Sequence, residues 1–583
     1  MRSRSPCSWA SHRRRCCPTW PSWHLNSVLL PLCTPTCKIW PSCRWRHAPR
    51  PLLIFGQDAT AFCASVTAAS SSTSRPALPT ADSVDVLLLL EGTFPYVAGG
   101  VSSWVNQIIR GFPELRFGAI FIGSRPQDYG DMRYALPDNL VHLEVTYLYD
   151  DLGGSDIRPT KVKADKTVMA EVKDLHDLLH ANMAHPDCGR LFASLMDQAH
   201  PCGALSRETF LHSEAAWKQI KDGYRRYSTD PSFVDYFWTI RIMHAPFWRL
   251  RAVAERCPQA RIYHSISTGY AGILGVLLKH RNQRPFILSE HGIYVKERKI
   301  DLYQAQWIKD NRTVFEHDPS QVSYYRQLWI RFFEHLGYLT YQASDHIVAL
   351  YEANRQRQLI DGAPSERTSN IPNGVDVERF GALRSQRSEG VPPVLCLIGR
   401  VVPIKDIKTF VRAMRIVVDR MPHAEAWIAG PEDEDPSYAA ECHDLVERLE
   451  LQASVKFLGF QKLTDILPKV GLVVLSSISE ALPLVILEGY AAGVPTVSTD
   501  VGSCRQLVYG LPGADEAIGA SGRIVRIADP EALAQASLEL LSDPVVWKQT
   551  SDAGIARVEK YYAQHMLFDR YRALYEQGFA WQA

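Results

Sequence analysis

The sequence lacks a hydrophobic run long enough to cross a membrane. A transmembrane helix needs about 20 consecutive apolar residues, whereas the best candidate, Val84–Leu90, has only the length of a strand. Neither a P-loop nor a G-x-G-x-x-G pattern occurs in residues 82–583, so a nucleoside triphosphatase or a nicotinamide enzyme has no support. The same range lacks a plausible cluster of metal ligands. We therefore predict no transmembrane segment, no metal and no other cofactor.

An excess of one charge is missing as well. Lys and Arg together number 64 and Asp and Glu 63, so the net charge is +1 and gives no reason to expect nucleic acid or an anionic membrane as a partner. The balance is uneven along the chain, because residues 1–57 contain nine Lys or Arg and no acidic residue. Residues 58–583 therefore carry 55 basic and 63 acidic residues, a net charge of −8.

Cysteine is scarce outside the N-terminal stretch. Seven of the 13 cysteines lie in the first 63 residues, and the rest are scattered, as is typical of a reducing cytoplasm in which thiols stay unpaired. The apolar run near the start, Val28–Leu30, is too short for the core of a signal peptide. We predict a cytoplasmic protein in which residues 1–81 are a disordered extension, either native or an upstream stretch outside the native product.

The rest of the chain has a globular composition and alternates strands with helices. Of the 583 residues of the whole chain, 46% are hydrophobic and 22% charged, and this length predicts two to four domains. The run Val84–Leu90 predicts a buried strand of a parallel sheet, followed by a glycine-rich loop and a helix. We assign residues 82–385 to one Rossmann-like domain with a helical insertion at about residues 155–255. Its further strands are predicted at residues 118–123, 140–145, 260–264, 285–289 and 346–350, with helices at 269–280 and 328–340.

A second series of strands and helices begins after a polar segment at residues 381–390, whose composition is typical of a linker. The series predicts a second Rossmann-like domain over residues 386–545, with helices at 546–583 that pack back toward the first domain. The fold class is therefore α/β, with two facing Rossmann-like domains whose strand ends surround one cleft. The strands of the second domain are predicted at residues 394–398, 424–429, 455–458, 472–475 and 496–498.

Two glutamates eight residues apart mark the segment SEALPLVILEGYAAG at residues 479–493. Glu480 is predicted in a loop, and Glu488 in the helix that follows. The amides of Leu484 and Val485 then lie at a helix N-terminus without a Ser, Thr or Asp cap, where they can bind a diphosphate. Ionised carboxylates accept hydrogen bonds from vicinal hydroxyls, so the pair suits a sugar at one end and a ribose at the other. The alternative is that both glutamates only lie near the positive end of a helix.

A second phosphate-binding set is predicted in LIGRVVPIKDIKTF, directly after a buried strand. Gly399, Arg400 and Lys405 lie in this strand-to-helix loop. The planar guanidinium and the ammonium would neutralise a diphosphate and stabilise the charge that grows on it as it leaves. We expect both the Lys405 and the Glu480 side chains on exposed loops. A solvated basic loop without function is the alternative.

Glycines and histidines supply the candidates in the first domain. Gly99 and Gly100 precede a helix N-terminus that would favour an anion, whereas a plain tight turn is the commoner explanation of such a pair. His291, in SEHGIY, follows a predicted strand and is placed at the cleft, with a structural role as its alternative. His264 stays open between ligand contact and a structural role. The turn IPNGVD at residues 371–376 stays open between ligand contact and joining the domains.

The order of these motifs resembles that in family 4 retaining glycosyltransferases of the GT-B fold. The motifs are, in order, the paired glycines, the SEHG histidine, IPNGVD, GRVVPIKD and the E-x7-E pair. The resemblance covers roughly residues 82–575. Within that family, the segments EGTFPYVAGGVSSWVNQII, HSISTGYAGILGVLLKHR and SEHGIYVKER are similar to the cytosolic glycosyltransferases of the Pel exopolysaccharide machinery, the PelF type. Asp406 replaces a Gly that commonly follows the Lys. This change fits the Pel type and weakens any inference about the donor sugar from distant relatives.

The resemblance implies a role for each candidate residue. Arg400 and Lys405 would bind the donor diphosphate, and Gly99 and Gly100 would line the phosphate side of the cleft. Glu488 would bind the ribose and Glu480 the transferred sugar. His291 would contact that sugar near the reacting carbon. It also implies retention of anomeric configuration, and transfer of a hexose or N-acetylhexosamine from a nucleotide diphosphate sugar, with UDP favoured. The implied partners are a growing biofilm exopolysaccharide as acceptor and an inner-membrane synthesis complex, to which the cytoplasmic enzyme would be peripheral.

Three other functions fit parts of this pattern. A glycoside hydrolase also needs two carboxylates, but it has no use for a cationic diphosphate clamp. A catalytically silent GT-B scaffold subunit of a polysaccharide secretion complex would not need intact clamp residues. A nucleotide-sugar epimerase on the same fold would consume no acceptor. Because no covalent nucleophile is evident, we expect same-face attack in which the leaving phosphate helps to deprotonate the acceptor.

Overall fold

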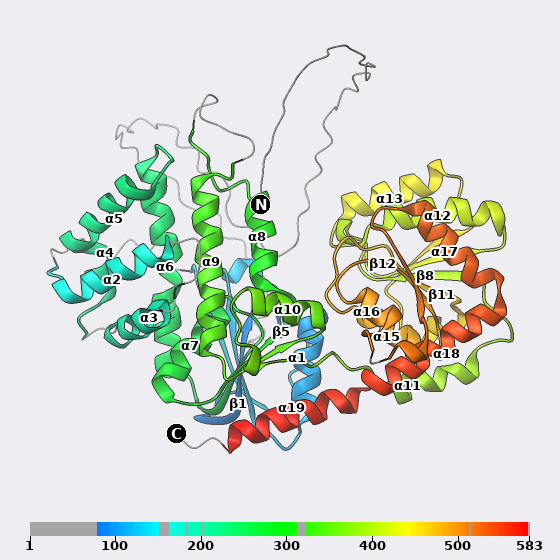
Figure 1. Ribbon diagram of the computed structural model, residues 1–583, viewed down its shortest axis with the longest axis horizontal. Coiled ribbons are helices and arrows are strands. Elements are labelled where there is room, and N and C mark those ends of the chain that lie inside the picture. Colours follow the sequence, from blue (N-terminus) through cyan, green and yellow to red (C-terminus); the bar gives the residue numbers. More distant parts are fainter. Residues whose placement is uncertain are drawn as a thin grey trace, which may run out of the picture. The chain divides into compact units, whose positions relative to one another are not determined.

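The computed structural model describes residues 78–580 except 151–161, 181–184, 186, 200–202, 313–320 and 514. The predicted disordered extension, residues 1–81, lies outside the described residues apart from its last four. The described chain forms two parallel sheets, each with its own helices (Figure 1).

The first sheet has seven parallel strands in the order β3-β2-β1-β4-β5-β6-β7. The inner strand β1, Ser83–Glu91, is fully buried from Val86 to Leu90, as expected for an apolar run in a parallel sheet that is covered on both faces. The other strands are β2 Phe117–Gly123, β3 Leu140–Tyr147, β4 Gln259–Ser265, β5 Phe286–Glu290, β6 His346–Ala349 and β7 Thr368–Asn370.

A helical insertion lies between β3 and β4, as predicted. Four of its helices begin at an Asp or Ser whose side chain accepts hydrogen bonds from the first free amides, which stabilises a helix start. The insertion contains α2 Lys166–Leu179, α3 Asp187–Gln198, α4 Arg207–His212, α5 Glu214–Tyr227 and α6 Phe233–Arg256. The helices nearer the sheet are α1 Gly100–Gly111, α7 Tyr270–Asn282, α8 Tyr294–Gln304, α9 Tyr324–Ala343 and α10 Glu352–Ile360.

The second sheet has six parallel strands in the order β10-β9-β8-β11-β12-β13. The strand order reverses between β8 and β11, and open α/β sheets bind ligands at the carboxyl ends of the strands beside such a point. The strands are β8 Val394–Ile398, β9 Glu425–Ala429, β10 Val455–Gly459, β11 Leu472–Leu475, β12 Thr496–Thr499 and β13 Gly522–Val525. Its helices are α11 Val377–Gly381, α12 Ile407–Arg420, α13 Pro436–Arg448, α14 Leu463–Ile466, α15 Leu484–Ala491, α16 Cys504–Tyr509 and α17 Pro530–Ser542. Both sheets have the doubly wound order of a Rossmann-like domain, which confirms the predicted fold class.

Two helices end the described chain. α18, Pro544–Tyr561, packs against α15 and α17, whereas α19, Gln564–Phe579, packs against β4. Tyr571 and Tyr575 of α19 are buried in the core of the first sheet. The turn IPNGVD meets the junction of these helices, because Val375 pairs with Ala563 and its amide donates to the Tyr562 carbonyl at 2.9 Å. This contact favours the joining role for the turn.

A buried ion pair fastens α18 to the loop that precedes β13. The Arg557 side chain has no exposed surface, and its Nε lies 3.0 Å from Asp515 Oδ2. The same guanidinium donates to the carbonyls of Val508 and Gly519 at 2.9 and 2.7 Å and to the hydroxyl of Ser521.

No helix in the described part of the chain combines the length and apolar character needed to cross a membrane.

Candidate active site

The loops that follow β8 and β11 bring Lys405 and Glu480 into contact. Lys405 Nζ lies 2.6 Å from Glu480 Oε1, and Ser477 Oγ donates to the same oxygen at 2.7 Å. The backbones are joined as well, because Ser476 Oγ donates to the Lys405 carbonyl and the Ile478 amide to the Ile404 carbonyl, both at 2.8 Å. The strand order therefore places the two predicted side chains together at the reversal point of the second sheet.

The exposure predicted for this pair is wrong. The side chains of Lys405 and Glu480 are only 19% and 14% exposed, since each covers the other and the two loops pack together. An ammonium held against a carboxylate in a half-buried setting is fixed in position before any ligand arrives. Such fixed groups lose little entropy on binding and suit the stabilisation of a developing charge.

Arg400 lies in the same strand-to-helix loop but has a different partner. Its Nη1 is 2.5 Å from both carboxylate oxygens of Glu434, which lies in the loop between β9 and α13, and the arginine side chain is 46% exposed. The structure therefore does not place the two predicted cations as a joint clamp. Arg400 has to share or leave Glu434 before it can reach a phosphate.

Gly399 shows why this loop needs glycine. Its φ of 157° lies in the region that favours glycine, and a Cβ built on Gly430 would lie 1.9 Å from the Gly399 carbonyl oxygen. The chain leaving β8 and the chain leaving β9 thus pass each other at backbone contact. This close approach sets the path of the loop that carries Arg400 and Lys405.

The N-terminus of α15 follows Glu480. Pro483 is the residue before the helix, and no side chain caps it. The first amides of a helix have no acceptor within the helix, so those of Leu484 and Val485 are available to an anion, as predicted. The helix dipole adds to the attraction.

Glu488 lies in the middle of α15 and is half-buried. Burial raises the pKa of its carboxyl to about 7, and the nearby Arg379 of α11 lowers it in part. The carboxyl is therefore half ionised near neutral pH. Only the ionised form is an acceptor at both oxygens, so its capacity to accept hydrogen bonds from two hydroxyls depends on pH.

If Glu488 binds the ribose, as the sequence resemblance implies, UDP should bind more tightly as the pH rises through about 7. Between about pH 6 and about pH 8 the ionised fraction of a carboxyl with this pKa rises by up to about tenfold. Calorimetric titration over this range should show the gain in the wild type and lose it in Glu488→Gln. The ligand's own titration is common to both proteins, so their difference isolates the carboxyl. Identical curves for the two proteins would exclude Glu488 from the ribose site.

Gly99 and Gly100 lie at the start of α1, after β1. Gly99 precedes the helix without a side-chain cap, and its amide lies 3.4 Å from the Tyr134 hydroxyl. A Cβ built on either glycine would meet no atom within 4 Å, so space is open here. Open space at a helix N-terminus is compatible with an anion, while the Tyr134 contact already uses one amide weakly.

His291 directly follows β5 and is nearly buried, with 7% exposure. Its ring packs edge-on against Trp104 of α1, with centroids 4.5 Å apart. Burial lowers the pKa of the imidazole to about 3, so the ring is neutral at any pH at which the protein would work. Within the described part of the chain, Nε2 is buried without a hydrogen-bond partner. A neutral ring of this kind can donate a hydrogen bond to a sugar hydroxyl or accept one from it, depending on its tautomer, but it cannot act as an acid near pH 7.

His264, which the sequence left open, has a structural role. It is fully buried, with Nδ1 2.9 Å from the Tyr575 hydroxyl and Nε2 2.8 Å from Ser289 Oγ. Tyr571 Oη reaches the same serine at 2.8 Å. The histidine thus links β4, β5 and α19.

Sequence reasoning missed Glu290, the residue before His291. Its carboxylate is 1% exposed and accepts from the Tyr341 hydroxyl at 2.6 Å, Gln358 Nε2 at 3.0 Å and the Tyr294 amide at 3.1 Å. Burial raises the pKa of this carboxyl. The network fixes the loop that carries His291. The only signal in the sequence is an acidic residue at the end of an otherwise apolar strand.

A metal site is a separate question. Among the residues that the structure describes, no group of three or more His, Cys, Asp or Glu side chains is arranged to hold a metal ion.

Family comparisons divide the chain in a similar way to the two sheets. Residues 84–366 match a family described as a domain of unknown function, DUF3492. Residues 392–543 match the family described as glycosyl transferases group 1. The second Rossmann-like domain is thus similar to the group 1 glycosyl transferases over most of its length. Lys405, Glu480 and Glu488 all lie within the matched range.

Curated relatives carry the same kind of name. D-inositol 3-phosphate glycosyltransferase 2 of Catenulispora acidiphila is 31% identical over 219 residues, which are 35% of this chain and 47% of the relative. A GDP-mannose-dependent monoacylated alpha-(1-6)-phosphatidylinositol monomannoside mannosyltransferase of Corynebacterium glutamicum is 26% identical over 222 residues, 34% of this chain and 54% of the relative. The chain spans about half the length of the curated relatives it matches.

A solved structure shares the fold over most of the chain. HepE of Anabaena, crystallised in complex with UDP, has a TM-score of 0.50 and 14% identity, and the similarity covers 85% of this chain and 100% of HepE. At this identity the similarity concerns the fold alone.

Proposed function

We propose that the protein is a retaining glycosyltransferase that moves a hexose or N-acetylhexosamine from a nucleotide diphosphate sugar to a polysaccharide acceptor. The observation that carries this proposal is the Lys405–Glu480 pair, held at the reversal point of a domain similar to the group 1 glycosyl transferases and followed by the uncapped α15. A fixed cation, free helix amides and a carboxylate are the groups needed to hold a diphosphate beside a sugar.

Each group has a distinct part in this proposal. Lys405 and the amides of Leu484 and Val485 bind the diphosphate, and Arg400 joins them when it leaves Glu434. Glu480 accepts hydrogen bonds from the hydroxyls of the transferred sugar, next to the phosphate. Glu488 accepts from the ribose.

In the chemical step, the bond between the anomeric carbon and the diphosphate oxygen breaks, and the acceptor oxygen bonds to that carbon on the same face. The acceptor proton passes to an oxygen of the leaving diphosphate. Lys405 and the α15 amides stabilise the negative charge that grows there. Neutral His291 would hold a sugar hydroxyl near the reacting carbon.

The donor base and the acceptor are narrower proposals. We favour uridine, the base implied by the sequence resemblance; HepE was crystallised with UDP, whereas the Corynebacterium relative is named for GDP-mannose. A melting-temperature screen against UDP, GDP and ADP and their common sugars would decide, because a ligand that binds only the folded state raises its stability. The sequence resemblance supports two narrower proposals. The acceptor is a Pel-type biofilm exopolysaccharide, and the enzyme is cytoplasmic and lies beside an inner-membrane synthesis complex.

Transfer should not require a divalent metal. The proposed clamp consists of side-chain cations and backbone amides, which neutralise the diphosphate without a metal ion. Initial rates measured with and without excess chelator should agree within error. A complete loss of activity in chelator, restored by adding back magnesium or manganese, would contradict the proposed clamp.

The reaction class is tested by release of nucleoside diphosphate. The proposal predicts release that depends on both donor and acceptor, with little hydrolysis of a simple aryl glycoside. Sugar isomerisation without diphosphate release would instead identify an epimerase, and donor binding without turnover would identify a scaffold.

A further inference from the structure

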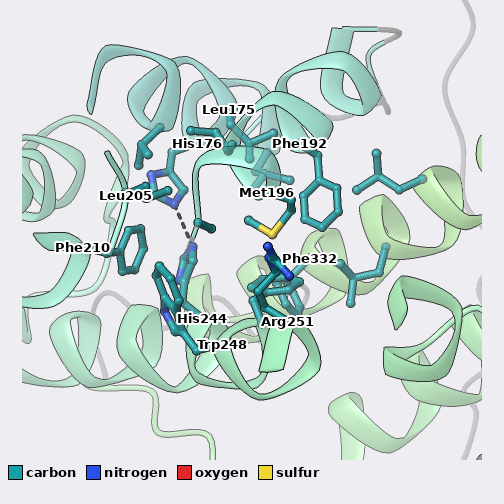
Figure 2. Close-up of a pocket in the computed structure, with 17 residues that line it drawn as sticks. Leu175, His176, Phe192, Met196, Leu205, Phe210, His244, Trp248, Arg251 and Phe332 are labelled. Atoms are coloured by element: carbon teal, nitrogen blue, oxygen red, sulfur yellow. Dashed lines mark hydrogen bonds between the residues drawn. The ribbon is translucent and has the colours of Figure 1, made fainter. Parts of the chain in front are cut away.

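The helical insertion contains two adjacent cavities that the proposed transfer does not use. The first, of about 60 Å³, is lined almost entirely by apolar side chains of α2, α3, α6 and α9, among them Leu175, Phe192, Met196 and Phe332 (Figure 2). The second, of about 110 Å³, lies between α2, α4, α5 and α6. His176 and Phe210 line both, so the two cavities adjoin.

A pair of histidines marks the boundary between the cavities. His176 Nε2 and His244 Nε2 are 2.8 Å apart, as the dashed line in Figure 2 shows. His244 Nδ1 lies 2.7 Å from the Ile240 carbonyl oxygen and must donate to it, so His244 Nε2 accepts and His176 Nε2 donates. Burial lowers the pKa of both rings, that of His176 to about 3, so the pair is neutral. The two Nε2 atoms are hydrogen-bonded to each other, so the pair presents no charge to either cavity.

The first cavity is therefore unsuited to water. An ordered water needs two to four polar partners, and cavities lined by Leu, Phe and similar side chains stay dry and accept apolar molecules instead. Arg251, at the other side of this cavity, is bound to Glu255 at 3.1 Å. The remaining lining is almost entirely apolar, which disfavours a hydrophilic ligand.

The second cavity differs because cations line it. Its acidic side chains are already paired: Asp177 with Lys173 at 2.6 Å and Arg226 at 3.5 Å, and Asp222 with Arg225 at 4.0 Å.

Arg241, which also lines the second cavity, has no ion pair among the described residues and only stacks on Phe237 at 5.5 Å. Burial lowers the pKa of Arg241, and the nearby Arg207 adds to the shift. A half-buried guanidinium beside a second cation favours an anion.

We propose that the helical insertion binds a single-chain amphiphile, with its anionic head group on Arg241 in the second cavity and its hydrocarbon chain passing the histidine pair into the first. A small apolar cavity that adjoins a cation-lined one suits a narrow, flexible chain with an anionic head better than a rigid ring system. The site is separate from the β8 and β11 loops, so it does not depend on the proposed transfer reaction.

Calorimetric titration of the full chain with dodecanoate, below its micelle concentration, tests the head group. We expect saturable binding of one molecule, weakened about tenfold or more in Arg241→Gln, since a charge-assisted hydrogen bond is lost. Arg207→Gln is the matched control, because it removes the same charge from an exposed neighbour that lines neither cavity. Absence of saturable binding, equal effects of the two variants, or equally tight binding of dodecyltrimethylammonium would overturn the proposal.

The chain length of the ligand tests the cavity. Affinity should rise from octanoate to dodecanoate in the wild type, and this gain should vanish in Ala199→Phe, which adds bulk to the wall of the first cavity. If that variant does not fold, the wild-type series alone decides: no gain with length would contradict a chain bound in the apolar cavity.

Discussion

Replacing Lys405 with alanine is expected to lower the rate of sugar transfer by about 10²–10³-fold, the usual cost of removing one fixed group that stabilises a developing negative charge. The ammonium is held by Glu480 at 2.6 Å, so its position is fixed before a diphosphate binds. Steady-state rates of diphosphate release at saturating donor would measure the loss. The fold should persist, because Ser477 still donates to Glu480 and the backbone bonds between the two loops remain.

Lys408→Ala provides the matched control. Lys408 lies in the first turn of α12, is 22% exposed and pairs with Glu441, so its loss removes an equal charge from a similarly covered site. We expect its rate to stay within about twofold of the wild type. Equal losses in the two variants would show that the effect is one of general charge or folding, and would remove Lys405 from the proposed clamp.

Replacing Arg557 with methionine is expected to destabilise the chain by about 3–5 kcal/mol, because it leaves the Asp515 carboxylate buried without its counter-ion. Arg557 has no exposed surface and Asp515 only 6%, so water cannot replace the lost partner. The carbonyls of Val508 and Gly519 also lose their donors. The measurement is the midpoint and slope of urea unfolding followed by circular dichroism.

Two further variants separate the charge from the packing. Lys560→Met, on an exposed position of the same helix, should change stability by no more than about 0.5 kcal/mol. Adding Asp515→Leu to Arg557→Met removes the stranded carboxylate and should recover part of the loss, since contacting residues are not additive. A double variant no more stable than Arg557→Met would contradict the electrostatic explanation.

Much of the fold follows from local patterns. The second-domain strands β8 and β11 were predicted with their observed bounds because each is a short apolar run that ends at polar loop residues. The strands β7 and β13 were not predicted. β7 has three residues, Thr368–Asn370, without an apolar side chain. β13 has four, a glycine and an arginine followed by two aliphatic residues. Neither has the hydrophobic periodicity of a strand. Each forms because it can pair with the edge of the neighbouring strand, β6 or β12.

The candidate site could be predicted only as separate pieces. Spacing placed Glu480 before a helix and Glu488 within it, but the contact between Lys405 and Glu480 depends on β8 and β11 being adjacent, which is a property of the sheet. The pairing of Arg400 with Glu434 depends in the same way on β9 lying on the other side of β8. A sequence cannot show which acid a cation meets across strands that are distant in the chain.

Burial explains the remaining differences. His264 lies near the end of β4 and His291 directly after β5, yet His264 is held between Tyr575 and Ser289, whereas His291 Nε2 has no partner among the described residues. The distinction comes from α19, which starts far along the chain and packs behind β4. Long-range packing of this kind leaves no local signal.

The central claim is that the β8 and β11 loops bind the diphosphate of a nucleotide through Lys405. Calorimetric titration of the wild type, Lys405→Ala and Lys408→Ala with UDP tests it most directly. The account predicts saturable binding by the wild type and by Lys408→Ala, and affinity at least tenfold weaker in Lys405→Ala. Undiminished UDP binding by a folded Lys405→Ala protein would contradict it.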